Sequence, residues 1–190
     1  LNPDKETLSH YENLQQQIEE YLKSVRTLAP LPTETEDGYS LSLSANVEGF
    51  SEVNHVKNID GCGIGLLRSE YLCKFIGAKF PSEEDQFEVY KKVVEALSPR
   101  PVVIRTFDVG GDKFAELVNG HEENNPFLGC RAIRFMLREK EVFKTQIRAL
   151  LRASAFGSLK ILLPMISSVQ ELLSAKEIIK YLSFCEFSSK

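Results

Sequence analysis

The chain has 190 residues, 43% of them hydrophobic and 26% charged, which is typical of a folded protein of one domain with or without an additional arm. Its formal net charge of −4 excludes the strongly basic balance of a nucleic-acid-binding protein. Its apolar runs are as short as strands and its first residues lack a signal-peptide pattern, so we expect no membrane insertion and no export signal.

The first predicted element is a helix over residues 4–26. A narrow stripe of apolar side chains follows helical spacing along it and is interrupted by Gln15. This stripe favours a helix that packs on a neighbouring domain over a long coiled coil. Its members are Leu8, Tyr11, Ile18, Leu22 and Val25.

Prolines and acidic residues then fill residues 28–38, as is typical of a segment between two parts of a chain. We therefore predict a linker helix with its boundary segment over residues 1–38 and a second domain over residues 39–190. The chain opens on Leu rather than Met, and we expect it to be a piece of a longer protein.

Beyond the boundary, short apolar runs alternate with helical sequence. Runs of this length and continuity suit strands that are buried on both faces, as in a parallel sheet. The predicted strands cover residues 41–47, 63–67, 101–107 and 160–166.

Helical patterns lie between most of these runs. Ser82 and Asp85 have the spacing of a capping box, so a helix begins after Pro81. We predict two more helices over residues 125–137 and 140–157, the second ending at Gly157. A last helix runs from an N-cap at Ser168 to Tyr181.

The alternation of strands and helices predicts an α/β fold with a parallel sheet and right-handed crossovers. Two architectures fit this order, a doubly wound open sheet and a (β/α)8 barrel. Four strand–helix units make only half of such a barrel, so the barrel reading implies that the chain holds its first half.

Two of the predicted strands end in the same way, with an arginine, then a small hydroxyl residue, and an acid close behind. Arg68 is followed by Ser69 and Glu70, and Arg105 is followed by Thr106 and, two residues later, Asp108. Ligands of parallel α/β folds bind at the carboxyl ends of the strands. An arginine there can donate two parallel hydrogen bonds to a phosphate or carboxylate, although a structural ion pair is the alternative interpretation.

A glycine turn follows the second arginine, in "VGGDK" over residues 109–113, and its backbone could approach a ligand closely. Arg131 is a third candidate, on a predicted helical face with Arg134 and Arg138. A similar row contains Lys144, Arg148 and Arg152. For both rows, a solvated basic surface is the favoured interpretation.

Cysteines occur at four separate positions without C-x-x-C spacing or paired histidines. We interpret them as free thiols of a reducing compartment and expect a cytoplasmic protein, with a zinc site as the less favoured alternative.

Several long motifs occur together in one order, and they cover nearly the whole chain. The motifs are "GIGLLRSEYL", "FPSEEDQFEVYKKV", "VVIRTFDVGGDK", "ENNPFLGCRAIR", "ALLRASAFG" and "LLPMISSVQEL". In this combination the chain resembles the Enzyme I family of the bacterial sugar phosphotransferase system, the phosphoenolpyruvate–protein phosphotransferases. The N-terminal segments are similar to that family's linker helix and first barrel strand.

The resemblance implies a (β/α)8 barrel that binds phosphoenolpyruvate and Mg²⁺. It further implies that the phosphoryl group passes to a histidine on a separate domain and then to the carrier protein HPr, within a homodimeric enzyme. By the same resemblance, Arg68 and Arg105 bind the phosphate and carboxylate of phosphoenolpyruvate, and Arg131 lies near the same site.

The family's G-G-x-x-S-H, E-T-P and N-D-L segments do not occur in these 190 residues. The resemblance therefore implies that the phosphorylated histidine, the Mg²⁺ ligands and the proton-donating cysteine lie outside this chain. We expect no catalytic residue within it and no activity of the chain alone. The alternatives are a non-catalytic barrel remnant or regulatory module, or part of a related pyruvate phosphate dikinase or phosphoenolpyruvate synthase.

Overall fold

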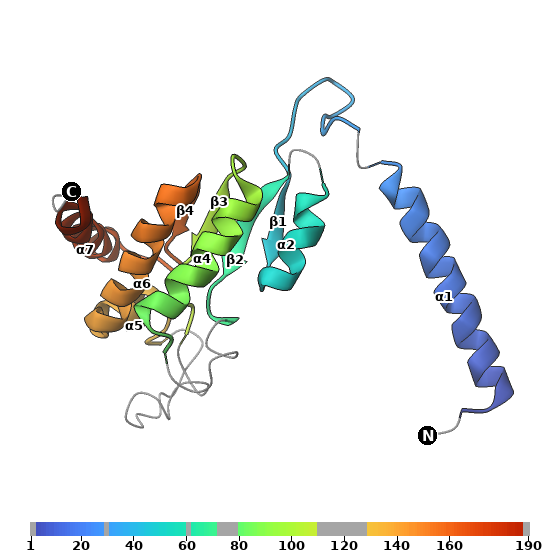
Figure 1. Ribbon diagram of the computed structural model, residues 1–190, viewed down its shortest axis with the longest axis horizontal. Coiled ribbons are helices and arrows are strands. Elements are labelled where there is room, and N and C mark those ends of the chain that lie inside the picture. The colour runs from blue at the N-terminus through green and yellow to red at the C-terminus, as the bar shows by residue number, and fades with distance from the viewer. Residues whose placement is uncertain (1–2, 29–30, 60–61, 72–79, 110–128, 188–190) are drawn as a thin grey trace. The chain divides into compact units, whose positions relative to one another are not determined.

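The computed structural model describes residues 3–28, 31–59, 62–71, 80–109 and 129–187. The chain divides into two compact units, Leu1–Ser42 and Leu43–Lys190 (Figure 1). No helix in the described ranges is both long enough and apolar enough to cross a membrane.

The first unit contains the predicted N-terminal helix, α1 (Lys5–Arg26). Asp4 caps it, because its carboxylate accepts a hydrogen bond from the backbone N–H of Thr7 at 2.7 Å. Farther along, Gly38 adopts a positive φ of 84° in a turn where its N–H donates to the Thr35 carbonyl at 2.8 Å. Glycine suits this turn because it has no Cβ to clash with the backbone.

The second unit is built on a parallel sheet whose strands follow one another in chain order. The strands are β1 (Ser44–Val47), β2 (Gly63–Arg68), β3 (Val102–Arg105) and β4 (Leu159–Leu162). The predicted parallel α/β fold is confirmed. Three predicted strands were too long, since β1 begins only at Ser44, β3 stops at Arg105 and β4 stops at Leu162. Beyond β4, Pro164 has no N–H to donate and Met165 has a φ of 58°, which turns the backbone out of the strand.

Helices follow the strands as predicted, with some changes of boundary. The capping box is present at Ser82 and Asp85 at the start of α4. The last helix extends six residues past Tyr181, because α7 ends at Phe187. The helices of this unit are α2 (Phe50–Lys57), α4 (Glu83–Leu97), α5 (Ile133–Arg138), α6 (Lys140–Ala153), the short 3₁₀ helix η2 (Ser154–Phe156) and α7 (Val169–Phe187).

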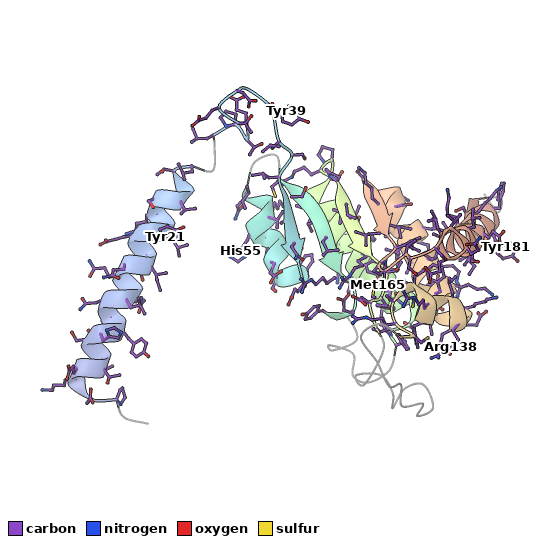
Figure 2. All side chains as sticks on the ribbon, turned by 180° about the vertical axis from the view of Figure 1, so that it is seen from behind. Tyr21, Tyr39, His55, Arg138, Met165 and Tyr181 are labelled. Carbon is purple, nitrogen blue, oxygen red and sulfur yellow. The ribbon has the colours of Figure 1, made fainter. Side chains whose placement is uncertain are left out.

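One face of the sheet is covered by α2, α4 and α6, which pack side by side in chain order (Figure 1). The opposite side of the same unit is turned toward the viewer in Figure 2. A doubly wound sheet would carry helices on both faces and would reverse its strand order. Strands in sequential order with one covering helical layer are the arrangement of a (β/α)8 barrel, so the structure favours that alternative.

The hydrophobic core lies between the sheet and this helical layer. Val102 and Ile104 of β3 are fully buried against it, as are Tyr90 of α4 and Ile147 of α6. Burial of each such aliphatic side chain contributes about 1.5–3 kcal/mol. Because side chains alternate along a strand, Val103 and Arg105 face the side of the sheet away from the helices.

Arg100 closes the C-terminal end of α2 from a position just before β3. Its guanidinium donates hydrogen bonds to the backbone carbonyls of Ile59 (2.8 Å), Lys57 (3.1 Å) and Cys62 (3.1 Å). The last carbonyls of a helix have no partners within it, and a positive charge at that end is favourable. This arginine therefore has a structural role at the N-terminal end of the strand that carries Arg105.

The predicted helix over residues 125–137 is wrong over residues 129–132, which are not helical. Residues 125–128 lie outside the described ranges, and α5 begins only at Ile133. Ala132 has a φ of 52°, and its N–H donates to the carbonyl of Val109 at 2.9 Å. This contact ties the segment before α5 to the end of β3, so Arg131 does not share a helical face with Arg134.

The predicted solvated row on α6 is also wrong for two of its members. Arg148 pairs with Glu83 at 2.6 Å, and Arg152 pairs with Glu83 at 3.0 Å and with Glu84 at 2.8 Å. Both acids lie in the first turn of α4. Only the third member, Lys144, keeps to its own helix, with Glu141 as partner.

Candidate functional site

The two strand-end arginines lie next to each other. Arg68 is the last residue of β2 and Arg105 the last of β3, and they are direct partners in the parallel ladder. The preceding residues, Leu67 and Ile104, are buried toward the helices. Because side chains alternate, both arginines project to the opposite face of the sheet at the same rim.

The hydroxyl residue after each arginine lies on the other face of the sheet, toward the helices. Ser69 and Thr106 are buried, at 1% and 0% exposure. The Ser69 hydroxyl donates to the backbone carbonyl of Arg105 at 2.5 Å. This bond joins the ends of β2 and β3 just beyond their last paired residues. In both motifs, the arginine therefore lies on the open face of the sheet and the small hydroxyl residue is buried toward the helices.

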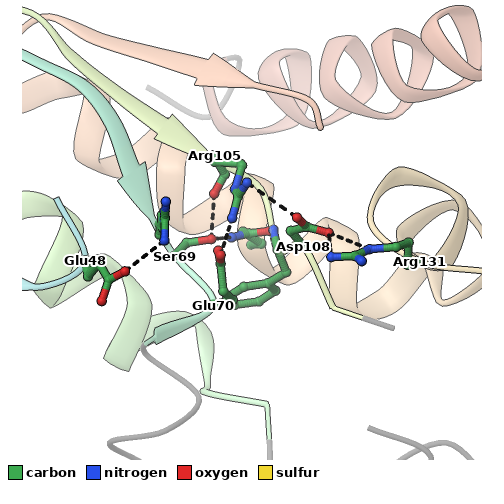
Figure 3. A network of polar contacts seen from close by, with 9 residues as sticks. Glu48, Ser69, Glu70, Arg105, Asp108 and Arg131 are labelled. Carbon is green, nitrogen blue, oxygen red and sulfur yellow. Dashed lines mark hydrogen bonds and ion pairs between the residues drawn. The ribbon is translucent and has the colours of Figure 1, made fainter. Parts of the chain in front are cut away.

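Acids at the rim hold both guanidinium groups (Figure 3). Glu48, which directly follows β1, pairs with Arg68 at 2.8 Å. Glu70, two residues after Arg68, hydrogen-bonds to Arg105. The side chains of Arg105 and Glu70 are mostly buried, so this pair is screened less by water and salt than an exposed one would be.

Asp108 connects the third candidate, Arg131, to Arg105 (Figure 3). Its carboxylate lies 3.4 Å from Arg105 on one side and 2.8 Å from Arg131 on the other. Arg131 makes two contacts to the same oxygen, from Nε at 3.0 Å and from a terminal nitrogen at 2.8 Å. The rim therefore carries Glu70, Arg105, Asp108 and Arg131 as one connected series of alternating charges. The Glu48–Arg68 pair is separate from this series, but the structure brings all three predicted arginines to the same rim.

Part of the hydrogen-bonding capacity of this rim is unused. The Nε atoms of Arg68 and Arg105 and one carboxylate oxygen of Glu70 are buried without a hydrogen-bond partner among the described residues. A buried polar atom left unpaired costs about 1–3 kcal/mol, and more when the group is charged. Such donors on adjacent arginines are suited to an oxyanion that would supply the missing acceptors.

The charges of the rim balance, with three arginines against three carboxylates. An anionic ligand would therefore share each guanidinium with an acid that already orients it. Arginine is suited to this because its planar group carries five N–H donors and can serve two partners at once.

A metal ion does not fit these residues alone. The described part of the chain contains no group of three or more acid, histidine or cysteine side chains that could hold one. Glu48, Glu70 and Asp108 are each bound to an arginine. Mg²⁺ requires several oxygen ligands in near-octahedral geometry, and these acids are not arranged to supply them.

Sequence reasoning identified Glu70 and Asp108 but missed Glu48. The signal was present, since Glu48 follows β1 as the other acids follow β2 and β3. The predicted glycine turn "VGGDK" begins at Val109, and its remaining residues lie outside the described ranges.

Comparison with known proteins shows similarity to one family throughout. Residues 22–184 match the family of the PEP-utilising enzyme, PEP-binding domain. The chain is 42% identical over 186 residues to phosphoenolpyruvate-protein phosphotransferase of Listeria innocua, covering 94% of the chain and 31% of that protein. It is 42% identical over 183 residues to the protein of the same name from Bacillus subtilis, with the same coverage. That of Staphylococcus carnosus is 40% identical over 181 residues, 95% of the chain and 31% of the relative. The chain thus spans about a third of the length of these relatives.

Proposed function

The chain belongs to the PEP-binding domain family of the PEP-utilising enzymes, and from this membership we propose that its strand-end arginines bind phosphoenolpyruvate for phosphoryl transfer. The donor would be phosphoenolpyruvate, and the reaction that of a phosphoenolpyruvate–protein phosphotransferase, as in the relatives that carry this name.

One observation carries the proposal, the register of Arg68 and Arg105 on adjacent strands, each with an unpaired buried Nε. Phosphoenolpyruvate offers a carboxylate and a phosphate on one small skeleton. Two neighbouring planar guanidinium groups can engage both with paired hydrogen bonds. Arg131, linked through Asp108, supports the same anion from the side of α5.

These residues would contribute positioning and charge. Phosphoryl transfer leaves little covalent chemistry for the protein, and catalysis depends on orientation and on neutralising the oxygens of the transferred group. The acids hold the arginines oriented before the ligand arrives, which reduces the reorganisation needed on binding.

The remaining parts of the reaction belong to the proposal as well. A histidine would accept the phosphoryl group and pass it to HPr for sugar uptake, in a cytoplasmic and homodimeric enzyme. The rim acids do not fit Mg²⁺, so the ligands of the Mg²⁺ that this family generally uses would come from residues beyond these 190.

The test is Arg105→Lys in the full-length protein that carries this chain. Lysine keeps the charge but cannot form the paired contact. We expect kcat/KM for phosphoenolpyruvate to fall by about 10²–10³-fold, as for loss of one preorganised donor. Steady-state assays of pyruvate release with HPr measure it.

A matched control is Arg100→Lys, the same substitution at the other end of β3. The Arg100 guanidinium donates to backbone carbonyls around the end of α2, away from the rim, so kcat/KM should stay within about threefold of the wild-type value. An Arg105→Lys variant that also stays within about threefold would refute the proposed role.

A further inference from the structure

Gln146, near the middle of α6, is a polar side chain in the hydrophobic core. It is 0% exposed. Burial of an amide is unfavourable unless its donors and acceptor are hydrogen-bonded. Gln146 makes three such bonds at 3.0 Å each, to the backbone N–H of Phe107, the hydroxyl of Ser69 and the hydroxyl of Tyr90.

The direction of these bonds follows from chemistry. The N–H of Phe107 can only donate, so the amide oxygen of Gln146 must face it, and the amide nitrogen must face the two hydroxyls. Ser69 then accepts from Gln146 and uses its own proton toward the carbonyl of Arg105 at 2.5 Å. The partners of Gln146 therefore fix which way its amide group faces.

The same logic orients the second branch. Tyr90 accepts from Gln146 and donates to Gln86 at 3.2 Å. The amide nitrogen of Gln86 donates to the carbonyl of Pro81 at 3.0 Å, and a carbonyl can only accept. Gln86 is also buried, at 1% exposure, but it bonds to Pro81 and Tyr90 rather than to the strand ends.

The position of Gln146 relative to the rim is what distinguishes it. Ser69 lies between Arg68 and Glu70, and Phe107 lies between Arg105 and Asp108 along the chain. Gln146 therefore holds the backbone at the ends of β2 and β3 from the helix side, while both arginines project from the other side. It contacts neither guanidinium in these bonds.

We propose that Gln146 is a positioning residue for the anion-binding rim, which sets the spacing of the β2 and β3 ends and thereby of Arg68 and Arg105. The inference rests on the proposed function, since it concerns the same ligand. A bidentate ligand depends on the separation of the groups that hold it, and small misplacements from distant residues can cost up to about 100-fold in rate. A purely structural residue would change stability without changing affinity.

The experiment measures phosphoenolpyruvate affinity by calorimetric titration of the full-length protein, beside urea unfolding. Gln146→Met keeps the length of the side chain and removes its hydrogen bonds. We expect its Kd for phosphoenolpyruvate to rise roughly 10- to 100-fold. Gln86→Met is the matched control, another buried glutamine of the same network. It should lose stability to a similar extent and bind with a Kd within about threefold of the wild-type value.

Gln146→Glu supplies a second test through its pH dependence. The protonated acid can accept from Phe107 and donate to one hydroxyl, whereas the ionised acid can only accept and would draw the Ser69 proton away from the Arg105 carbonyl. The ratio of its Kd to the wild-type Kd should therefore grow as the pH is raised from 5.5 to about 8.5, because burial keeps the neutral form at the lower end.

The outcomes separate the two claims. Wild-type protein without measurable phosphoenolpyruvate binding would overturn the proposed function and this inference with it. Wild-type binding together with an unchanged Kd in Gln146→Met, or equal increases in both methionine variants, would overturn the positioning role alone. Should Gln146→Met fail to fold, a Kd ratio for Gln146→Glu that does not vary with pH would do the same.

Discussion

At the scale of single residues, the pleat of the strands explains the repeated phrase at the ends of β2 and β3. Each arginine faces the open side of the sheet, and the following hydroxyl residue faces the helices. An acid at each strand end lies at the rim and pairs with an arginine of the same or the neighbouring strand. The order of residue types thus reflects a two-sided environment, with an open face and a packing face one residue apart.

Gly63 shows how closely the strands approach at the other end of the sheet. A Cβ there would lie 2.5 Å from the carbonyl oxygen of Pro101, which accepts a hydrogen bond from Ile64 at 2.9 Å. Gly63→Ala must therefore push β2 away from β3, and we expect it to lower the free energy of unfolding by about 1–3 kcal/mol. Chemical denaturation measures this loss.

Gly49→Ala is the matched comparison, because a Cβ at Gly49 would meet nothing within 4 Å. Gly49 is the N-cap of α2 with extended backbone, where exchange to alanine costs only a small amount, about 1 kcal/mol or less. Equal losses in the two variants would show that the approach of β2 and β3 does not depend on glycine.

At the scale of elements, α4 and α6 are joined by ion pairs as well as by their apolar faces. Arg148 and Arg152 of α6 both bind Glu83 in the first turn of α4. Arg152 also stacks over the ring of Phe87 at 3.9 Å from its centroid. The acid at the start of α4 also suits the helix dipole, so one carboxylate supports the helix and its neighbour together.

These contacts predict how stability depends on pH. Burial by itself would raise the pKa of Glu83, but hydrogen bonds and charges from Arg148 and Arg152 outweigh it and lower the pKa overall. A carboxylate whose pKa is lower in the folded than in the unfolded protein stabilises the fold fully above its unfolded pKa. This stabilisation is lost as the pH falls through the folded pKa.

We therefore expect Glu83→Gln to be less stable than wild type by about 1 kcal/mol at pH 7. The difference should shrink below about pH 4, where the wild-type carboxylate becomes protonated. Urea unfolding at several pH values would show this. Glu95→Gln, at an exposed glutamate of the same helix, serves as control and should change stability at pH 7 by less than about 0.5 kcal/mol. A difference for Glu83→Gln that persists unchanged at pH 2.5 would contradict the assignment.

At the scale of the whole molecule, β4 is the last strand of the sheet within the described residues. The helix that follows, α7, exposes Leu173, Tyr181 and Phe184 at 53%, 64% and 63%. Open strand edges and apolar surface of this kind favour association with another chain.

The 190-residue polypeptide by itself should therefore release no pyruvate from phosphoenolpyruvate and should elute from a sizing column as more than a monomer. Its arginines can attract the anion, but the sequence contains none of the G-G-x-x-S-H, E-T-P or N-D-L segments of the resembled family. A pyruvate assay with Mg²⁺ and HPr tests this.

Arg105→Ala provides the control for that assay, because activity that survives it comes from a contaminant. Turnover that the substitution abolishes would contradict the expectation of inactivity, and a monomeric elution volume would contradict self-association.

The sequence by itself determined the alternation of strands and helices, the family, and the two arginines at strand ends. The alternation and the strand ends are local features, because the spacing of apolar residues and the alternation of faces depend on neighbours one to four positions away. The family followed instead from a resemblance carried by several long motifs in one order. The strand–helix pattern by itself left a barrel and a doubly wound sheet open, and the resemblance implied the barrel. The sequence wrongly placed Arg131 within a helix that begins only at Ile133.

Only the tertiary structure decided which groups meet. Strand register places Arg68 beside Arg105. Contacts between distant segments bring Glu48 to Arg68 and Asp108 to Arg131. Gln146 has no sequence signal at all, since a glutamine on an amphipathic helix looks like a surface residue. Its role depends on the packing of α6 beneath two strand ends, and such a long-range placement is specified by the whole core rather than by any local pattern.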